Sequence, residues 1–361
     1  MQNAPMPPID IINLDTTSQV ARYPSLPFTT KPPELFNGEL LTPDLRHMYD
    51  QLWHQISGPR DITLHVLLGA IVEGPGLVFD AGLRLIRDSI HQTTEAEVAQ
   101  AVAQVRASIA DGGPPLVPGV TLLSEKSGIG NYGHWLVEML PIVYLSRGWL
   151  VSTEWRMRVP IMPTAMAAVV RDSLDLLGIP PAQRLLRDPG PQRYEHLVIT
   201  RGLSHHGITY SPCIVDCLEA LAEAVPGGPP CRVWVSRAGA TRSLKSEQAV
   251  CCALRQLGWT IAQPWEMTLR EQIALFKGAT HIAGVAGAGL TNLCFAARGA
   301  TVTAFMPARM PDVFFWMMAE FKEHYYREVR CAQPPDPSGG KNWEMTIQMS
   351  VDEVLSYLAD L

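Results

Sequence analysis

Residues 280–305, THIAGVAGAGLTNLCFAARGATVTAF, contain the pattern that decides the fold. Apolar runs at 280–287 and 301–305 indicate buried strands, and the segment 288–300 between them indicates a helix. The same alternation precedes this stretch, with strands expected at 232–237 and 259–264 and helices expected at 246–258 and 269–279. Strands separated by helices of this length form a parallel sheet covered by helices on both faces. The sequence therefore predicts an α/β fold for the C-terminal region.

The rest of the chain has a weaker pattern. The proline-rich beginning of the chain is typical of an extended arm. It is followed by strands that are expected to break at Gly74-Pro75 and by a helix that Thr94 is expected to cap. The stretch PGGPPC has the composition of a linker. The expected parts are an extended arm at 1–40, an N-terminal α/β domain at 41–225, a linker at 226–231 and a C-terminal domain at 232–361.

Composition narrows the class of protein. A net charge of −6 over 361 residues argues against the broad basic surface that nucleic-acid binding needs. Seven dispersed cysteines suit a reducing compartment, and we expect a cytoplasmic protein. Neither a secretion signal nor an apolar run long enough to span a bilayer is visible, although a peripheral membrane contact and a homo-oligomer are both compatible with the sequence.

Ligands bind at the carboxyl ends of the strands in such a sheet. Ser236 and Arg237 end the first strand and Arg242 follows, so two guanidinium groups can donate hydrogen bonds to phosphate oxygens. The alternative is that these residues form a solvated surface loop. Trp265 and Glu266 end the second strand, where they can stack on a base and accept hydrogen bonds from a ribose. Glu266 can equally cap the next helix.

Glycines at 284, 287 and 289 follow the third strand and allow backbone N–H groups to approach an anion at the start of the next helix. Their spacing is the reverse of the dinucleotide fingerprint, and the next strand ends without an acidic residue for a ribose. A nicotinamide-dependent enzyme is therefore disfavoured. The chain also has no phosphate-binding motif of the G-x-x-x-x-G-K-[ST] type.

The stretch GIGNYGHWLVEMLP, residues 128–141, has His134 and Glu138 in an otherwise apolar helical run. A spacing of four places both side chains on one face, where Glu138 can orient His134 as a general base. Glu138 can also be the base or contact the acceptor, and the pair can be purely structural. Pro141 predicts a local irregularity because it has no N–H group. His205 and His206 carry little signal, and the cysteine spacing indicates no metal site.

The stretch 130–141, the Ser-Arg followed by a second arginine, and the block 271–292 resemble glycosyltransferase family 61, over roughly residues 60–330. The resemblance implies a GT-B fold, in which two Rossmann-like domains face each other across a cleft. It implies inverting transfer from a nucleotide sugar, commonly a UDP-sugar, to a glycan or glycolipid of the capsule type, without a metal or other cofactor. The N-terminal domain then binds the acceptor and the C-terminal domain binds the donor.

Site residues follow from this resemblance. His134 and Glu138 are the expected catalytic pair, with Asn131 and Tyr132 on the acceptor side. The expected donor-binding residues are Ser236, Arg237, Arg242, Trp265, Glu266, Gly287, Ala288, Gly289, Leu290, Thr291 and Asn292. The chain departs from the family at Ala286, where members usually have histidine, and at LKSEQ after Arg242, where members tend to have Asn-Glu. The alternatives are a catalytically silent sugar-nucleotide-binding protein, favoured by Ala286, and an NAD-dependent oxidoreductase.

Overall fold

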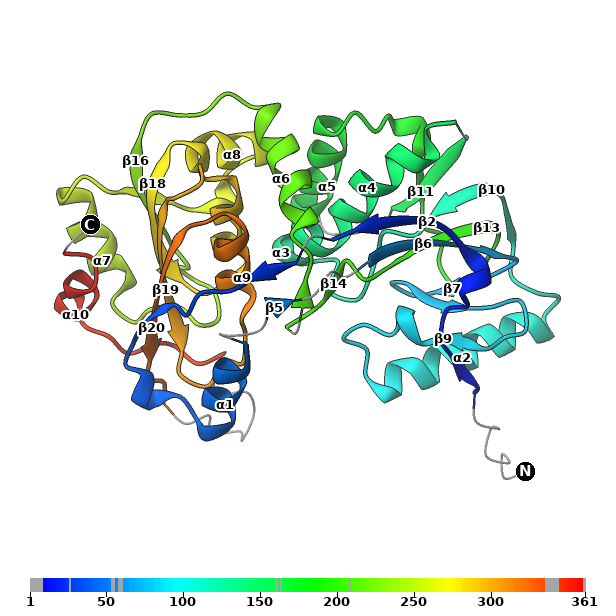
Figure 1. Ribbon diagram of the computed structural model, residues 1–361, viewed down its shortest axis with the longest axis horizontal. Helices are drawn as coiled ribbons and strands as arrows, with labels where there is room; N and C mark the ends of the chain where they lie inside the picture. The colour runs from blue at the N-terminus through cyan, green and yellow to red at the C-terminus, as the bar shows by residue number, and fades with distance from the viewer. Residues whose placement is uncertain are drawn as a thin grey trace. The chain divides into compact units, whose positions relative to one another are not determined.

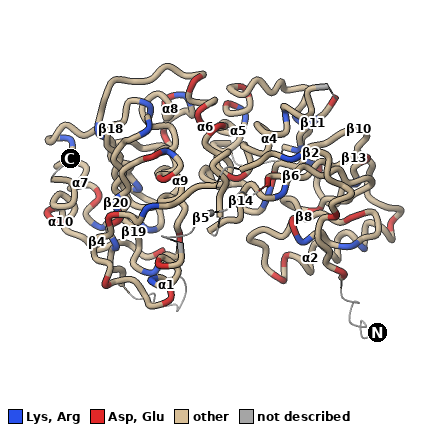
Figure 2. The backbone as a smooth tube through the Cα atoms, viewed as in Figure 1, with Lys and Arg blue, Asp and Glu red and all other residues tan. Residues whose placement is uncertain are grey.

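In the computed structural model the chain folds into two compact units of mixed α/β structure (Figure 1). Unit 1 contains Met1–Ser25 and Arg60–Ser211, and unit 2 contains Leu26–Pro59 and Pro212–Leu361. The structure describes residues 9–25, 27–52, 56–57, 61–152, 154–159, 162, 164–207, 209–334 and 344–359. Among these residues, no helix is both long and apolar enough to cross a membrane. Basic and acidic residues are interspersed in each unit (Figure 2).

Unit 2 is built on a parallel sheet. Its strands are β4 (Glu34–Phe36), β16 (Cys231–Val235), β17 (Thr260–Ala262), β18 (Ala279–Val285), β19 (Thr301–Pro307) and β20 (Tyr325–Cys331), with a separate pair β3 (Phe28–Thr29) and β5 (Ile56–Ser57). Their order is β17-β16-β18-β19-β20-β4, and every neighbouring pair is parallel. The order reverses between β16 and β18. In doubly wound sheets the ligand site lies at this reversal.

Helices cover both faces of this sheet. They are α1 (Pro43–Leu52), α6 (Cys213–Glu223), α7 (Glu247–Gln256), α8 (Leu269–Lys277), α9 (Phe314–Phe321) and α10 (Val351–Ser356). On one face, Val250 and Leu254 of α7 and Val354 of α10 share a core with Trp234 of β16. Figure 1 shows α8 and α9 on the other face. The helices at 246–258 and 269–279 and the strands of the C-terminal region are thus confirmed.

The segment 288–300 differs from its expected form. It is a 3₁₀-helix over Ala288–Phe295 instead of an α-helix. Side chains from Leu290 to Phe295 are all buried, so the segment has no solvent-facing stripe like that of an amphipathic α-helix. A Cβ at Gly289 would lie 3.0 Å from Pro264 Cγ and 3.2 Å from Val235 Cγ1, which shows how closely this backbone packs on the sheet.

The unit boundaries differ from the expected domains. The segment 226–231 lies inside unit 2, because it connects α6 to β16 within that unit. The apolar face of α6 is fully buried there, and Lys277 Nζ of α8 donates to the carbonyl oxygens of Ala222 and Val225 at 2.6 and 2.7 Å. The glycines and prolines of this segment therefore form a loop inside one unit.

The expected arm at 1–40 contains short strands. β1 (Ile11–Ile12) pairs with β9, β2 (Gln19–Pro24) pairs with β6, and β4 lies at the edge of the unit 2 sheet. Residues 1–8 lie outside the described residues. A proline-containing extended segment can still pair at a sheet edge, because an edge strand needs only some of its N–H groups.

Unit 1 has a mixed sheet. Its strands are β1, β2, β6 (Asp61–Leu68), β7 (Ile71–Glu73), β8 (Leu77–Phe79), β9 (Leu85–Ile86), β10 (Leu116–Leu122), β11 (Trp155–Val159), β12 (Arg184–Leu186) and β13 (Gln192–Arg201), and a hairpin is formed by β14 (Ser204–His205) and β15 (Thr209–Tyr210). β13, β10, β11 and β12 are parallel, whereas β6 and β7 pair with β13 in the antiparallel sense. The strands on either side of Gly74-Pro75 are confirmed.

The helices of unit 1 are α2 (Glu95–Ala110), α3 (Tyr132–His134), α4 (Leu140–Trp149) and α5 (Thr164–Leu176). Thr94 caps α2 as expected, and its side chain accepts a hydrogen bond from Glu97 N. The chain leaves β10 at its carboxyl end and enters α3 through residues 123–131. This connection places the His134 helix at the carboxyl edge of the parallel part of the sheet, where ligands bind in α/β folds.

Candidate functional site

The helix that carries His134 and Glu138 is irregular. α3 ends at His134, and Trp135–Met139 form a π-helical turn before α4. The N–H of Leu140 donates to Trp135 O, five residues earlier, and Pro141 has no N–H group to continue an α-helical ladder. The irregularity expected from Pro141 is thus present. π-turns of this kind often occur at functional sites.

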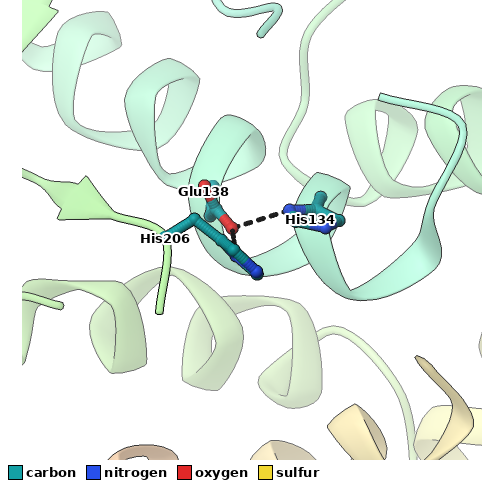
Figure 3. A group of neighbouring side chains, drawn as sticks. All are labelled: His134, Glu138 and His206. Atoms are coloured by element: carbon teal, nitrogen blue, oxygen red, sulfur yellow. Dashed lines mark hydrogen bonds and ion pairs between the residues drawn. The ribbon is translucent and has the colours of Figure 1, made fainter. Parts of the chain in front are cut away.

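Two histidines converge on one oxygen of Glu138 (Figure 3). His134 Nδ1 lies 2.7 Å from Glu138 Oε1, and His206 Nδ1 lies 2.8 Å from the same atom. The two imidazole rings are 4.4 Å apart between centroids. His206 follows β14 in the β14–β15 hairpin, so the three side chains come from two separate parts of unit 1.

Glu138 determines which ring nitrogen of each histidine is protonated. Burial alone would raise the pKa of the Glu138 carboxyl, but hydrogen bonds from His134 and His206, with the charges of His134 and Lys126, lower it below its usual value. The carboxylate therefore stays ionised and can only accept hydrogen bonds. Each Nδ1 must carry the proton that it donates, so in a neutral His134 ring Nε2 is the nitrogen without a proton.

Exposure separates the roles of these groups. The Glu138 side chain is 5% exposed, whereas the His134 and His206 side chains are 15% and 29% exposed. The carboxylate is thus sealed behind two rings that solvent and ligands can still reach. An orienting carboxylate behind an accessible imidazole is the arrangement that general-base catalysis requires.

The same three residues are of the types that bind zinc, and their ligand atoms lie within 4.8 Å of one another. Ligands about 2.1 Å from a tetrahedral metal ion are about 3.4 Å apart. The separations of 2.7 and 2.8 Å between each Nδ1 and Glu138 Oε1 are instead those of charge-assisted hydrogen bonds. In this conformation the three groups fit shared protons better than a metal ion.

In unit 2 the structure brings together two of the expected donor-binding loops. Arg237 follows the carboxyl end of β16 and Gly287 follows that of β18, at the point where the strand order reverses. A Cβ at residue 287 would overlap the Arg237 guanidinium group, so the arginine lies directly against the glycine backbone. The absence of a side chain at Gly287 is what allows this contact.

Carboxylates act on both arginines of this site without forming ion pairs with them: Glu247 acts on Arg237, and Asp312 and Glu344 act on Arg242. Burial, followed by the charge of Arg242, lowers the pKa of Arg237 to about 10, and burial also lowers the pKa of Arg242. The Nε atoms of both are buried without a hydrogen-bond partner. Within the described part of the chain, neither guanidinium group forms a salt bridge. Two neighbouring cations with unused donors are suited to an anion such as a diphosphate.

The other expected site residues have varied surroundings. Trp265 is 52% exposed, and Glu266 is exposed and accepts from Gln263 Nε2 at 3.3 Å; the following helix is capped by Thr268 instead. Asn292 is buried and donates to Gln272 Oε1 at 2.8 Å. Thr291 and Leu290 are buried, as is Ser236, whereas Ala288 and Gly289 are partly exposed.

On the acceptor side, Asn131 caps α3 and its Oδ1 accepts from Gly133 N at 2.9 Å. Tyr132 is half-buried at the start of that helix. Sequence reasoning gave little weight to His206, which is now part of the site. Its signal was the His-His pair just after a strand that ends at the ligand edge of a parallel sheet.

Comparison with known families agrees with this geometry. Residues 132–303 match the family model of Glycosyltransferase 61. The resemblance stated from the sequence is therefore confirmed over that range, which begins in the His134 helix and includes the Arg237 and Gly287 loops. This family implies glycosyltransferase activity in general. No curated protein matches the chain.

Proposed function

We propose that this protein is an inverting glycosyltransferase that moves a sugar from a nucleotide-sugar donor, commonly a UDP-sugar, to a hydroxyl group of a polysaccharide or glycolipid. The observation that carries this proposal is the single Glu138 oxygen contacted by two histidines. This contact supports His134 as the base, because its Nε2 is free of the proton and its ring is held in one orientation. The family match supports the reaction class.

In the proposed reaction, His134 Nε2 takes the proton of the acceptor hydroxyl as the oxygen attacks the anomeric carbon. The bond between that carbon and the diphosphate oxygen breaks on the opposite face, and its electron pair leaves with the nucleoside diphosphate. Glu138 stabilises the imidazolium that forms, and Arg237 and Arg242 neutralise the leaving group. Protons and charge balance without a redox partner.

The structure of each unit bears on which one binds the donor and which one binds the acceptor. The parallel sheet of unit 2 supports it as the donor-binding unit, since its best anion site lies at the strand-order reversal. The sheet of unit 1 is mixed, so its likeness to a Rossmann-like acceptor domain is confined to the parallel strands β13, β10, β11 and β12. A GT-B arrangement and a cytoplasmic location remain predictions.

A panel of nucleotide sugars tests the proposal most directly. We expect one nucleotide class to raise the melting temperature and its sugar to appear on an added glycan acceptor with inverted anomeric configuration. Stabilisation by a nucleotide sugar without transfer to any acceptor would favour a catalytically silent binding protein, to which the departure at Ala286 points. Ala286 is fully buried beside the glycine block. Retention of anomeric configuration would exclude an inverting mechanism.

Chelation tests the metal-independent part. Because arginines and protons supply the electrostatics in this proposal, transfer should survive excess EDTA. If activity disappears on chelation and returns with zinc or manganese, the metal-independent part of the proposal is wrong. His134→Ala is expected to be inactive with or without EDTA, so this variant cannot decide whether a metal ion is needed. The deciding measurement is the rate of the unmodified protein with EDTA and after metal is restored.

A further inference from the structure

Unit 1 has a pocket of about 420 Å³ beside the Glu138 cluster. His205 lines this pocket, and the next residue, His206, contacts Glu138. The volume lies within the range of about 300–1,000 Å³ that is usual for small-molecule sites. Its polar lining includes Arg87, His91, Lys126, Arg201, Ser204 and His205.

The pocket lies where an α/β sheet binds its ligands. Lys126 follows the carboxyl end of β10, and Arg201 is the last residue of the neighbouring parallel strand β13. His205 belongs to β14, just beyond β13. The carboxyl ends of adjacent parallel strands form the ligand-binding edge of the sheet. The His134 helix begins at this same edge, so the pocket and the proposed base share one side of unit 1.

The charges in the pocket do not balance. Asp88 lines it and pairs with Arg201 at 2.9 Å, and its other oxygen accepts from Leu14 N at 3.2 Å. Arg87 and Lys126 form no ion pair with any carboxylate in the described ranges. The lining therefore has three cationic side chains against one carboxylate, which is already paired.

Lys126 is the least satisfied of these cations. Its ammonium group donates to Ser204 Oγ at 3.2 Å, although an ammonium group has three donors. Burial lowers the pKa of Lys126, and the charge of Glu138 opposes this effect only in part. Glu138 itself is occupied by two histidines. The remaining donors of Lys126 are available to a ligand in the pocket.

The neighbouring imidazoles complete a polar wall. His91 and His205 meet edge to face, with ring centroids 6.4 Å apart. Burial, followed by the charge of Lys126, lowers the pKa of His91 to about 3, so this ring is neutral at pH 7. The neutral imidazole of His91 has one donor and one acceptor, which suits a hydroxyl group of a sugar beside an anionic group.

We propose that this pocket is an acceptor subsite for an oxyanion, a phosphate or carboxylate group carried by the saccharide, held by Lys126 and Arg87. Binding of that group there positions a nearby hydroxyl for His134. The inference rests on the proposed transferase function for the identity of the saccharide as an acceptor, but the anion site itself is defined by the pocket alone.

Calorimetric titration of inorganic phosphate, glucuronate and glucose tests this site. The parent protein carries Arg237→Ala and Arg242→Ala, so that phosphate does not bind at the proposed donor site. At least one of the two anions should bind and glucose should not. Lys126→Met should weaken the binding of that anion about tenfold or more, because a charge-assisted hydrogen bond is lost. Phosphate or glucuronate preference identifies which oxyanion the acceptor carries.

Arg171→Met is the matched control. Arg171 lies on α5, is exposed, pairs with Asp172 at 2.9 Å and does not line the pocket, so anion affinity should be unchanged. Absence of binding by both anions overturns the proposal, as does equal affinity in a Lys126→Met protein with a native melting temperature. If Lys126→Met does not fold, Arg87→Gln decides, because this exposed side chain can be changed safely and unchanged affinity overturns the site.

Transfer assays separate this proposal from the transferase function. Anion binding that depends on Lys126, with no transfer from any donor, would contradict the function and leave the pocket standing. Transfer to neutral acceptors at a rate that Lys126→Met does not alter, together with absent anion binding, would contradict the pocket and leave the function standing. If the transferase function and the anion site are both correct, kcat/KM for an acidic acceptor should fall at least tenfold in Lys126→Met. The value for Arg171→Met should not change.

Discussion

Two buried carboxylates, Glu138 in unit 1 and Glu328 in unit 2, are surrounded by hydrogen-bond donors in very different ways. Glu328 is fully buried and pairs at 2.6 Å with Arg330, which is also fully buried and donates to the carbonyl oxygens of Pro307 and Met310. Glu138 is nearly buried, but its partners are two imidazoles that solvent can reach.

The chemistry of the partners explains the difference. A guanidinium group does not release its proton near neutral pH, so the Glu328 cluster can only stabilise the fold. An imidazole exchanges protons near neutral pH, so the Glu138 cluster can take part in a reaction. A buried charged pair is therefore a candidate site only when its partner titrates and has an accessible face. Mutations in the two clusters should affect different measurements.

The largest effect is expected from His134→Ala. Loss of a general base typically lowers turnover by about 10²–10⁴-fold. Nucleotide affinity should change little, because the arginines of the anion site lie in unit 2. Turnover of the variant should be measured beside its thermal stability. Near-normal turnover in a folded His134→Ala protein would remove this residue from the mechanism.

Glu138→Gln refines that result. If the carboxylate only orients the imidazole, this variant should lose less activity than His134→Ala, and it should lose more if Glu138 takes the proton itself. A purely structural role predicts that both variants unfold at lower temperature with unchanged turnover per folded molecule. Comparing the two rates with the two melting temperatures distinguishes these three cases.

In the other cluster, Glu328→Gln should act on stability alone. The change leaves Arg330 buried without its countercharge, and breaking a buried pair costs about 3–5 kcal/mol of unfolding free energy. Glu323→Gln is a control in the same unit, since Glu323 and its partner Arg298 are 72% and 48% exposed, and it should cost less than about 1 kcal/mol. Urea denaturation measures both values, and equal losses would contradict the comparison.

The sequence was most informative where the determining interactions are local. The capping of α2 by Thr94, the turn at Gly74-Pro75 and the irregularity near Pro141 each depend on neighbours within about five residues. The strand-helix alternation of unit 2 also predicted its parallel sheet, and therefore the sheet edge at which Arg237 and Gly287 meet.

Interactions between distant residues were not visible in the same way. His206 is 68 residues from Glu138, and no local pattern indicates that the two side chains meet. β4 pairs with β20, which comes almost 300 residues later in the chain. Because nothing near residues 34–36 in the sequence indicates this partner, they were predicted to be part of an arm. The boundary at 226–231 was placed by composition, although the packing of α6 assigns that segment to unit 2.

A smaller effect is expected at the anion site of unit 2. Arg237→Ala or Arg242→Ala should weaken nucleotide binding about tenfold or more, because each removes a charge-assisted contact worth about 1.5–3 kcal/mol. Gly287→Ala should act in the same direction, since its methyl group would occupy the position of the Arg237 guanidinium group. Unchanged affinity for UDP and related nucleotides in both arginine variants would contradict the donor-site assignment.

The smallest effect concerns His324, a buried histidine with no carboxylate partner among the described residues. Burial lowers the pKa of His324 from 6.5 to about 4, and its Nε2 donates to Leu293 O at 3.0 Å. The folded protein keeps this ring neutral while the unfolded chain protonates it, so its contribution to stability is complete above pH 6.5 and is lost as pH falls toward 4.

Between these values the unfolding free energy should fall by up to about 1.4 kcal/mol per pH unit on account of this group. His324→Gln can keep the hydrogen bond to Leu293 O but binds no proton, so it should flatten the pH dependence by up to that amount. Urea denaturation of both proteins at pH 7 and pH 5 measures the difference. An identical slope in the two proteins would show that His324 does not change its protonation on unfolding and would contradict this prediction.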